Sequence, residues 1–573
     1  MLSLTQRYND TTMCGIWGYI SHNDINIPVT KLQEASETVQ PRGPERTIVN
    51  ATDKHYMCFH RLAINGLSSE HDQPYVYTQG QHKYILMCNG EIYNQRELEH
   101  EYCLQHSACD TEVIYPVWKA LDYDFVELNK TLNGEYALSI LHLVNDTPVR
   151  LYLSVDPCSV RPLFFSIDKY THSVAFSSLL VGLSTLNVQA TRLPGGTCLS
   201  YYFPFGSHQQ VSYIDWHPKL DKALRDDTYA LKRKIVKTLT ACIEKRLQSD
   251  RPIGCFLSGG LDSSLVAAIL SKLLRKRGQR LHTFSIGAVD SEDCRHAQMV
   301  ATHIESIHTH VPFDSHVAIN YLQSVVKAIE SYDITTVRAS IGQYLVSKYI
   351  AENTDIKVVF SGDGADEEQM GYLYFFRSPS PEEANEESRK LLQEIHLYDG
   401  LRVDRCVSVH GLEARVPYLD WDFVSLYLSI PAYLKCPKKR ADGTVYVEKA
   451  LIRDAFMLSN PHILPQKVLY RTKETFSDSL STEKSSWYAL LKATVEREVH
   501  TCAAQSLIAS MRHSSGWKHL PPTTDEGTYY RYLHTLFFGQ KSATVIPHIW
   551  MPNWSDAKDP SARQLEVYNE VQK

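Results

Sequence analysis

The sequence lacks any apolar run long enough to cross a membrane, and residues 1–13 lack the continuous apolar stretch of a signal peptide. It also lacks a basic excess: the formal net charge is −6, whereas proteins that bind polyanions usually carry a surplus of lysine and arginine. We therefore expect neither a membrane nor a nucleic acid as a partner.

Cysteine pairs at metal-binding or redox spacing are missing as well. The 13 cysteines are irregularly placed, with no CxxC pair and no Cys/His cluster at zinc spacing. We expect free thiols in a reducing compartment and hence a cytoplasmic protein. The sequence leaves the oligomeric state open, and a homodimer is one of the states that it allows.

The length and a change of pattern along the chain predict two main domains. A chain of 573 residues is too long for one hydrophobic core. Short β-rich runs fill the first third, whereas from about Asp226 helical patterns alternate with short apolar strands, as in a parallel α/β sheet. The expected divisions are a first domain (14–205), a linker (206–225), a second domain (226–545) and a C-terminal strap (546–573).

A glycine turn at the end of an apolar strand is the most informative segment. Strand 253–257 runs into Ser258-Gly259-Gly260-Leu261-Asp262-Ser263-Ser264, and a helix is expected to follow through residues 265–277. Exposed backbone N–H groups and the helix N-terminus predict a phosphate site. The lysine of a GxxxxGK[ST] loop is absent, and a carboxylate beside phosphates indicates Mg²⁺.

A second glycine turn follows strand 357–360 and reads Ser361-Gly362-Asp363-Gly364-Ala365-Asp366-Glu367. Because open α/β sheets bind ligands at the carboxyl ends of their strands, both turns are expected at one site. On its own, this segment is equally compatible with a solvated acidic turn.

Near the start of the chain, Cys14 stands in Cys14-Gly15-Ile16-Trp17-Gly18. A lone cysteine on an apolar strand is more often a small core residue than a nucleophile. Likewise, Asn89-Gly90 fits a type I′ hairpin turn. Three further strings favour a functional site: Arg42-Gly43-Pro44-Glu45, His60-Arg61-Leu62-Ala63-Ile64 and Cys109-Asp110-Thr111-Glu112.

Together these strings resemble the asparagine synthetase family, of animal type, from Cys14 to about Tyr568. The first part is similar to class II glutamine amidotransferase domains, and the glycine turn to the pyrophosphate loop of ATP pyrophosphatases. Further matching strings are Glu330-Ser331-Tyr332-Asp333, Gly411-Leu412-Glu413-Ala414-Arg415, Lys473-Glu474-Thr475-Phe476-Ser477-Asp478 and Trp550-Met551-Pro552. The implied fold class is an α+β glutaminase domain with sandwiched antiparallel sheets and helices, followed by an α/β synthetase domain with a parallel sheet.

The resemblance implies synthesis of asparagine from aspartate, ATP and glutamine, with ammonia as an alternative nitrogen source and Mg²⁺ as cofactor. Glutamine hydrolysis would release ammonia, ATP and aspartate would form aspartyl-AMP and pyrophosphate, and ammonia would convert the adenylate to asparagine and AMP. A pure glutaminase, another amide-forming enzyme such as a β-lactam synthetase, and an inactive binding protein are the rival interpretations.

The resemblance also assigns the glutaminase residues. Cys14 would be the nucleophile with its own α-amine as base, so leader residues 1–13 are expected to be absent from the mature protein. The Asn89 side chain and the Gly90 N–H would form the oxyanion hole. Arg61 would bind the α-carboxylate of glutamine, and Glu91 and Asp110 its ammonium. The implied glutamine set is Arg61, Leu62, Ala63, Ile64, Asn65, Asn89, Gly90, Glu91 and Asp110.

In the synthetase half, the implied ATP set is Leu257, Ser258, Gly260, Asp262, Ser263, Ile286, Ser361 and Gly362. Asp262 and Asp366 would share the magnesium ion. Thr335 and Arg338 would face the phosphates or the adenylate, and Lys473 would neutralise the departing pyrophosphate. Asp363 is implied to be catalytic, although the animal-type family usually has glutamate at this position.

Overall fold

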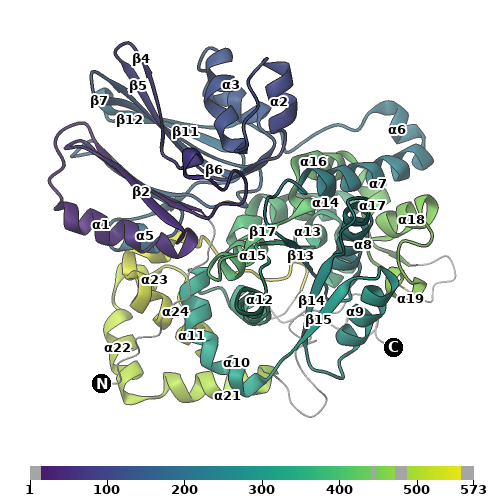
Figure 1. Cartoon of the computed structure of the whole chain (residues 1–573). Helices are drawn as coiled ribbons and strands as arrows, with labels where there is room; N and C mark the ends of the chain where they lie inside the picture. The colour runs from purple at the N-terminus through teal and green to yellow at the C-terminus, as the bar shows by residue number, and fades with distance from the viewer. Residues whose placement is uncertain (1–13, 440–445, 472–486, 556–573) are drawn as a thin grey trace.

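Two six-stranded antiparallel sheets form the N-terminal third of the chain, at the upper left of Figure 1. The computed structural model describes residues 14–439, 446–471 and 487–555. The first sheet has the order β10-β8-β9-β1-β3-β2, with β1 (Gly15–Ser21), β2 (Arg46–Ala51), β3 (His55–Arg61), β8 (Phe164–Asp168), β9 (Ser173–Ser177) and β10 (Thr191–Arg192). The second has the order β12-β11-β7-β6-β5-β4, with β4 (Tyr75–Gln79), β5 (His82–Ile92), β6 (Gly134–Val144), β7 (Thr147–Val155), β11 (Thr197–Tyr202) and β12 (Ser207–Ser212).

Alternation along β1 explains how the two sheets are held together. Ile16 and Ile20 point into an apolar layer shared with Met87 of β5 and other inward residues of both sheets. Trp17, on the opposite face, packs in a second cluster with residues of α1 (Val29–Glu37) and α5 (Val181–Ser184). Because the sandwich buries Ile16 and its neighbours, the start of β1, just after Cys14, is anchored in the core.

Residues 207–212, expected to begin the linker, instead form edge strand β12, which pairs with β11. The strand reads SHQQVS and is almost fully exposed, so it carries none of the apolar alternation by which a strand is recognised. The other domain divisions remain predictions. Leader residues 1–13 lie outside the described residues, as does the strap beyond residue 555.

A five-stranded parallel sheet with helices on both sides forms the second half, which confirms the predicted fold class. Its order is β15-β14-β13-β16-β17, with β13 (Ile253–Phe256), β14 (His282–Gly287), β15 (Ile307–Pro312), β16 (Val358–Phe360) and β17 (Glu413–Arg415). The chain builds outward from β13 first on one side and then on the other. The loops after the neighbouring strands β13 and β16 therefore lie at the topological switch point, where such sheets bind ligands.

The helices of this half cover the sheet and extend its edges (Figure 1). They include α7 (Thr228–Lys245), α8 (Leu261–Lys276), α9 (Glu292–His303), α11 (Leu322–Ile329), α12 (Ile334–Asn353), α14 (Pro381–Glu394), α15 (Asp399–Ser408), α16 (Trp421–Ser429), α18 (Ala450–Ser459), α21 (Trp487–Val499), α22 (Cys502–Met511) and α24 (Asp525–Phe538). Helix α8 ends one residue before its expected limit, and Gly278 follows with φ of +73°.

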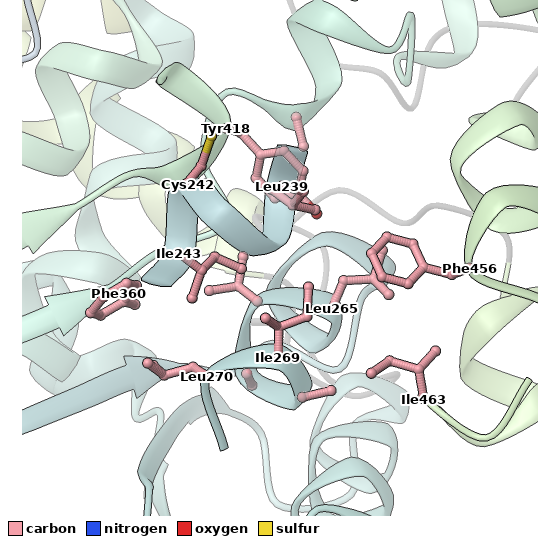
Figure 2. Packing of buried hydrophobic residues seen from close by; sticks show 14 of the residues in the cluster. Leu239, Cys242, Ile243, Leu265, Ile269, Leu270, Phe360, Tyr418, Phe456 and Ile463 are labelled. Carbon is pink, nitrogen blue, oxygen red and sulfur yellow. The ribbon is translucent and has the colours of Figure 1, made fainter. Parts of the chain in front are cut away.

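The core beneath β13 is built where α7 and α8 cross, as Figure 2 shows with Leu239 and Ile243 of α7 beside Leu265 and Ile269 of α8. This cluster also includes Leu62 and Ile64 from the first domain, which are 2% and 4% exposed. The two domains therefore share apolar core as well as polar contacts.

Two further observations concern the part of the chain that the structure describes. None of its helices combines the length and the apolar character needed to span a bilayer. Every cysteine whose side chain is described is a free thiol.

Candidate active sites

Cys14 immediately precedes β1, and its thiol lies against the backbone that follows β3. The Leu62 N–H donates to Cys14 Sγ at 3.3 Å, and the thiol in turn donates to the Leu62 carbonyl oxygen at 3.2 Å. Arg42 Nε donates to the Cys14 carbonyl oxygen at 3.0 Å. Burial raises the pKa of the Cys14 thiol to about 12, so the thiol is protonated at neutral pH and needs a base before it can attack.

The loop of residues 62–66, termed here the glutamine loop after its expected ligand, follows β3 and passes beside this thiol. Arg61, at the end of β3, turns its guanidinium into the loop and donates to the Ser68 carbonyl oxygen at 2.6 Å. It also bonds to the Gly66 carbonyl oxygen and to the Asp72 carboxylate. Arg61 therefore organises the loop, and a glutamine carboxylate would have to share its guanidinium with Asp72.

Asn89 and Gly90 lie within strand β5, opposite Ala137 and Tyr136 of β6, so they do not form a hairpin turn. Asn89 is fully buried, and its Oδ1 has no hydrogen-bond partner. Gly90 has φ of +141°, and an added Cβ would lie 2.0 Å from the Glu135 carbonyl oxygen, so only glycine fits. An unsatisfied buried amide oxygen beside a position that only glycine can occupy is consistent with a ligand site in this strand.

Glu91 and Asp110 form a buried acidic pair beside Asn65, which donates to Asp110 at 3.5 Å and also bonds to Glu91. Burial, followed by the charge of Asp110, raises the pKa of Glu91 well above its usual range. Burial likewise raises the pKa of Asp110 to about 6. A cationic ligand between them would favour their ionised forms, which is the property required of an ammonium subsite.

The candidate synthetase site is a cavity of about 310 Å³ at the carboxyl ends of β13 and β16. The expected ATP residues lie together there: Leu257, Ser258, Gly260, Asp262, Ser263, Ile286, Ser361 and Gly362 all line it. The first loop is locked by its own hydroxyls, with Ser258 Oγ 2.9 Å from Ser263 Oγ. A Cβ on Gly362 would meet the Ser263 backbone nitrogen at 2.8 Å, so this glycine lets the two loops touch.

Asp262 and Asp366 face one another across Lys449, which the sequence did not single out. Lys449 Nζ lies 2.5 Å from Asp262 Oδ2 and 2.6 Å from Asp366 Oδ1. Burial alone would lower the pKa of Lys449, but the two carboxylates raise it above its ordinary value. The three side chains form a charged cluster in the lining of the cavity, with Lys449 buried and the two aspartates partly exposed.

This cluster is chemically suited to magnesium. Among the described residues there is no group of three or more His, Cys, Asp and Glu side chains that could hold a metal alone. Mg²⁺, however, is usually bound by one or two carboxylates together with substrate phosphates and water. Asp262 Oδ1 is buried and has no hydrogen-bond partner, so it is available as an oxygen ligand.

Asp363 is held on both of its oxygens inside the same cavity, so the second turn is no solvated acidic loop. Arg402 of α15 donates to Asp363 Oδ1 at 2.5 Å, and Ser361 Oγ bonds to Oδ2. Gln343 of α12 lies 3.5 Å from the same Oδ2. Arg402 thus pairs with the aspartate carboxylate at a position where family members usually have the longer glutamate.

The remaining predicted site residues differ in whether they line the cavity. Thr335 lines the cavity, and its buried Oγ1 has no hydrogen-bond partner. Arg338 does not line the cavity; its Nη2 donates to Glu526 of α24 at 2.6 Å. Lys473 lies outside the described residues.

Several residues that line the cavity had no role assigned from the sequence, among them Lys449, Arg402 and Trp550. Trp550 is held by a bond from its N–H to Asp333 Oδ2 at 2.9 Å, so the described start of the C-terminal strap reaches the cavity. The string Trp550-Met551-Pro552 was a usable signal for this contact, whereas Lys449 and Arg402 belong to no phosphate-binding pattern.

Comparisons with known proteins agree with this two-site arrangement. The family model "Asparagine synthase" matches residues 234–387 and 377–514, and the model "Glutamine amidotransferase domain" matches residues 13–213. The chain is 37% identical to the asparagine synthetase [glutamine-hydrolyzing] of Bos taurus, covering 98% of this chain and 100% of that one. It is also 37% identical to the enzyme of the same name from Gallus gallus, covering 97% and 99%.

Among solved structures, the glutamine phosphoribosylpyrophosphate amidotransferase of B. subtilis aligns over 52% of this chain and 81% of that chain. The identity is 14% and the TM-score is 0.30, so this likeness carries no weight beside the full-length relatives. At 37% identity over nearly the whole of both chains, the chain belongs to the glutamine-hydrolysing asparagine synthetases.

Proposed function

We propose that Cys14 and the 258–264 loop serve the two half-reactions of asparagine synthesis from aspartate, ATP and glutamine. Glutamine hydrolysis gives glutamate and ammonia, adenylation of aspartate releases pyrophosphate, and ammonia converts aspartyl-AMP to asparagine and AMP. The observation that carries the proposal is the convergence of both loops, Asp262, Asp366 and Lys449 on one cavity, with a separate thiol site in the other domain.

In the glutaminase site, the Cys14 thiol attacks the side-chain amide of glutamine, and water then cleaves the thioester. The α-amine of Cys14, free in a chain that starts at this residue, would accept the thiol proton. Asn89 and Gly90 would donate to the oxyanion, and Glu91 and Asp110 would bind the substrate ammonium. Arg61 would bind the α-carboxylate after its bond to the Asp72 carboxylate is broken.

In the synthetase site, Leu257 and Ile286 would contact the adenosine end of ATP, and the N–H groups of the 258–264 loop its phosphates. Mg²⁺, held by Asp262 and Asp366, would supply positive charge beside the pyrophosphate. Lys449 already lies between these carboxylates and would add a second cation there. Thr335 would donate to the phosphates or the adenylate, and Lys473 would assist departure of pyrophosphate.

We also place this chemistry in the cytoplasm, in keeping with the free thiols. Every residue proposed for the two sites comes from a single chain. A homodimer therefore remains a proposal about assembly, on which neither half-reaction depends.

Asp363 provides a test of the synthetase assignment. Asp363→Ala is expected to lower asparagine formation about a hundredfold, because it leaves Arg402 without this partner at the reacting centre. Asp363→Glu is expected to retain activity within about tenfold, because the longer carboxylate can still pair with Arg402. The measurement is asparagine production from either nitrogen source, with the glutaminase rate as internal control. Full synthetase activity of the alanine variant would show that this carboxylate is a bystander.

A further inference from the structure

A short turn of the second domain, residues 249–251, forms hydrogen bonds with the glutamine loop and is termed here the clamp. Arg251 Nε donates to the Ala63 carbonyl oxygen at 2.8 Å. The Asp250 N–H donates to the Ile64 carbonyl oxygen at 3.0 Å. The clamp therefore holds two successive peptide groups of a loop that belongs to the other domain.

Side-chain hydrogen bonds also join the clamp and the loop, with donors on both segments. The Gly66 N–H donates to Asp250 Oδ2 at 3.0 Å. Glu45 bridges the clamp and the loop, because its Oε1 accepts from Arg251 Nη2 at 2.7 Å and its Oε2 accepts from the Ala63 N–H at 2.9 Å. Arg251 and Glu45 are 28% and 26% exposed, so both can be replaced without opening the core.

The loop held in this way forms the wall of the glutaminase site. Leu62 exchanges bonds with the Cys14 thiol on one side, and its side chain enters the shared core on the other. Ile64 enters the same core, which also contains Leu257 beside the ATP cavity. Sequence-distant segments of the synthetase domain thus fix both the backbone and the side chains of this wall.

We infer that Asp250 and Arg251 are positioning residues for glutamine, supplied by the synthetase domain to the glutaminase site. The inference rests on the proposed assignment of residues 61–65 to glutamine. A loop already fixed by the clamp loses little conformational freedom when glutamine binds, whereas a released loop would have to be ordered at that moment. The clamp itself contacts neither the thiol nor the oxyanion donors, so we expect its effect on glutamine binding to exceed its effect on the chemical step.

The test is steady-state kinetics of Arg251→Met in the full-length protein. Removing the guanidinium while keeping the length of the side chain should raise the KM for glutamine about three- to tenfold, with kcat of glutamine hydrolysis within about twofold. Synthesis from ammonia should be unchanged, although the substituted residue belongs to the synthetase domain. Glu45→Gln should also raise the KM for glutamine. Because Arg251→Lys keeps the charge, its KM should lie between those of the unaltered protein and Arg251→Met.

Arg275→Met is the matched control, because Arg275 is an exposed arginine of the same domain that pairs with Glu305 on the surface. It should leave both activities intact. An unchanged glutamine KM in Arg251→Met would overturn the inference, and so would an equal loss of ammonia-dependent synthesis, which would reveal a general structural defect. If Cys14→Ala loses glutamine hydrolysis while Arg251→Met has an unchanged KM, the site assignment stands and only the inference about the clamp fails. An unaltered protein that does not hydrolyse glutamine would overturn both.

Discussion

Cys14→Ala should abolish asparagine formation from glutamine, by at least about 10⁴-fold, and leave synthesis from added ammonia at its original rate. The reason is that the thiol lies in the first domain, beside Leu62, whereas the ATP cavity lies at the carboxyl ends of β13 and β16. Glutamate release and asparagine production, measured with each nitrogen source, give the comparison.

Cys103→Ala is the control for this variant, because Cys103 is an exposed thiol away from the site. It should retain both activities. If a folded Cys14→Ala protein lost ammonia-dependent synthesis as well, the separation of the two sites would be wrong. If it still hydrolysed glutamine, another nucleophile would have to be sought.

Asp262→Asn should slow ATP–pyrophosphate exchange in the presence of aspartate by about 10²- to 10³-fold, with glutamine hydrolysis preserved. The substitution removes a charge from the cluster in which Lys449 lies 2.5 Å from Asp262, and it replaces an oxygen ligand suited to Mg²⁺. Magnesium-dependent binding of a nucleotide, followed by calorimetry, provides a second readout that does not depend on turnover.

The control is Asp290→Asn, which neutralises an exposed carboxylate just before α9. It should change neither exchange nor nucleotide binding. Normal exchange and normal magnesium dependence in Asp262→Asn would contradict the assignment of Asp262, even if asparagine formation were reduced for other reasons.

Local patterns were sufficient to predict the strand, turn and helix around the proposed ATP loop. Strand, glycine turn and helix follow one another between residues 253 and 276, so their geometry is encoded by neighbouring residues. The order of the five parallel strands then brings the loops after β13 and β16 together, as the general rule for such sheets predicts. Lys449 could not be predicted in this way, because it reaches Asp262 from 187 positions along the chain.

The tertiary structure was needed to resolve ambiguities within short motifs. Asn89-Gly90 has the composition of a hairpin turn, but pairing with β6 places both residues within a strand. Arg338 has the charge expected of a phosphate ligand, and in the structure it pairs with Glu526 of α24. In each case a distant partner decides between two local conformations or contacts that the sequence leaves open.

The clamp illustrates the same limit for interfaces. Arg251 precedes β13 in an ordinary polar turn, and nothing in its neighbourhood points to Glu45 or Ala63. The edge strand β12 escaped recognition for a different reason, since an exposed strand needs no apolar alternation. Contacts between domains and solvated edges were therefore the least predictable parts of the molecule.

The most direct measurement is the fate of the label in a reaction with amide-¹⁵N glutamine, unlabelled aspartate and ATP. The two-site account predicts asparagine with ¹⁵N in its side-chain amide, accompanied by glutamate and by AMP and pyrophosphate in equal amounts. Added unlabelled ammonia should compete for the same adenylate. Release of glutamate without labelled asparagine, or formation of ADP and phosphate instead of AMP and pyrophosphate, would contradict it.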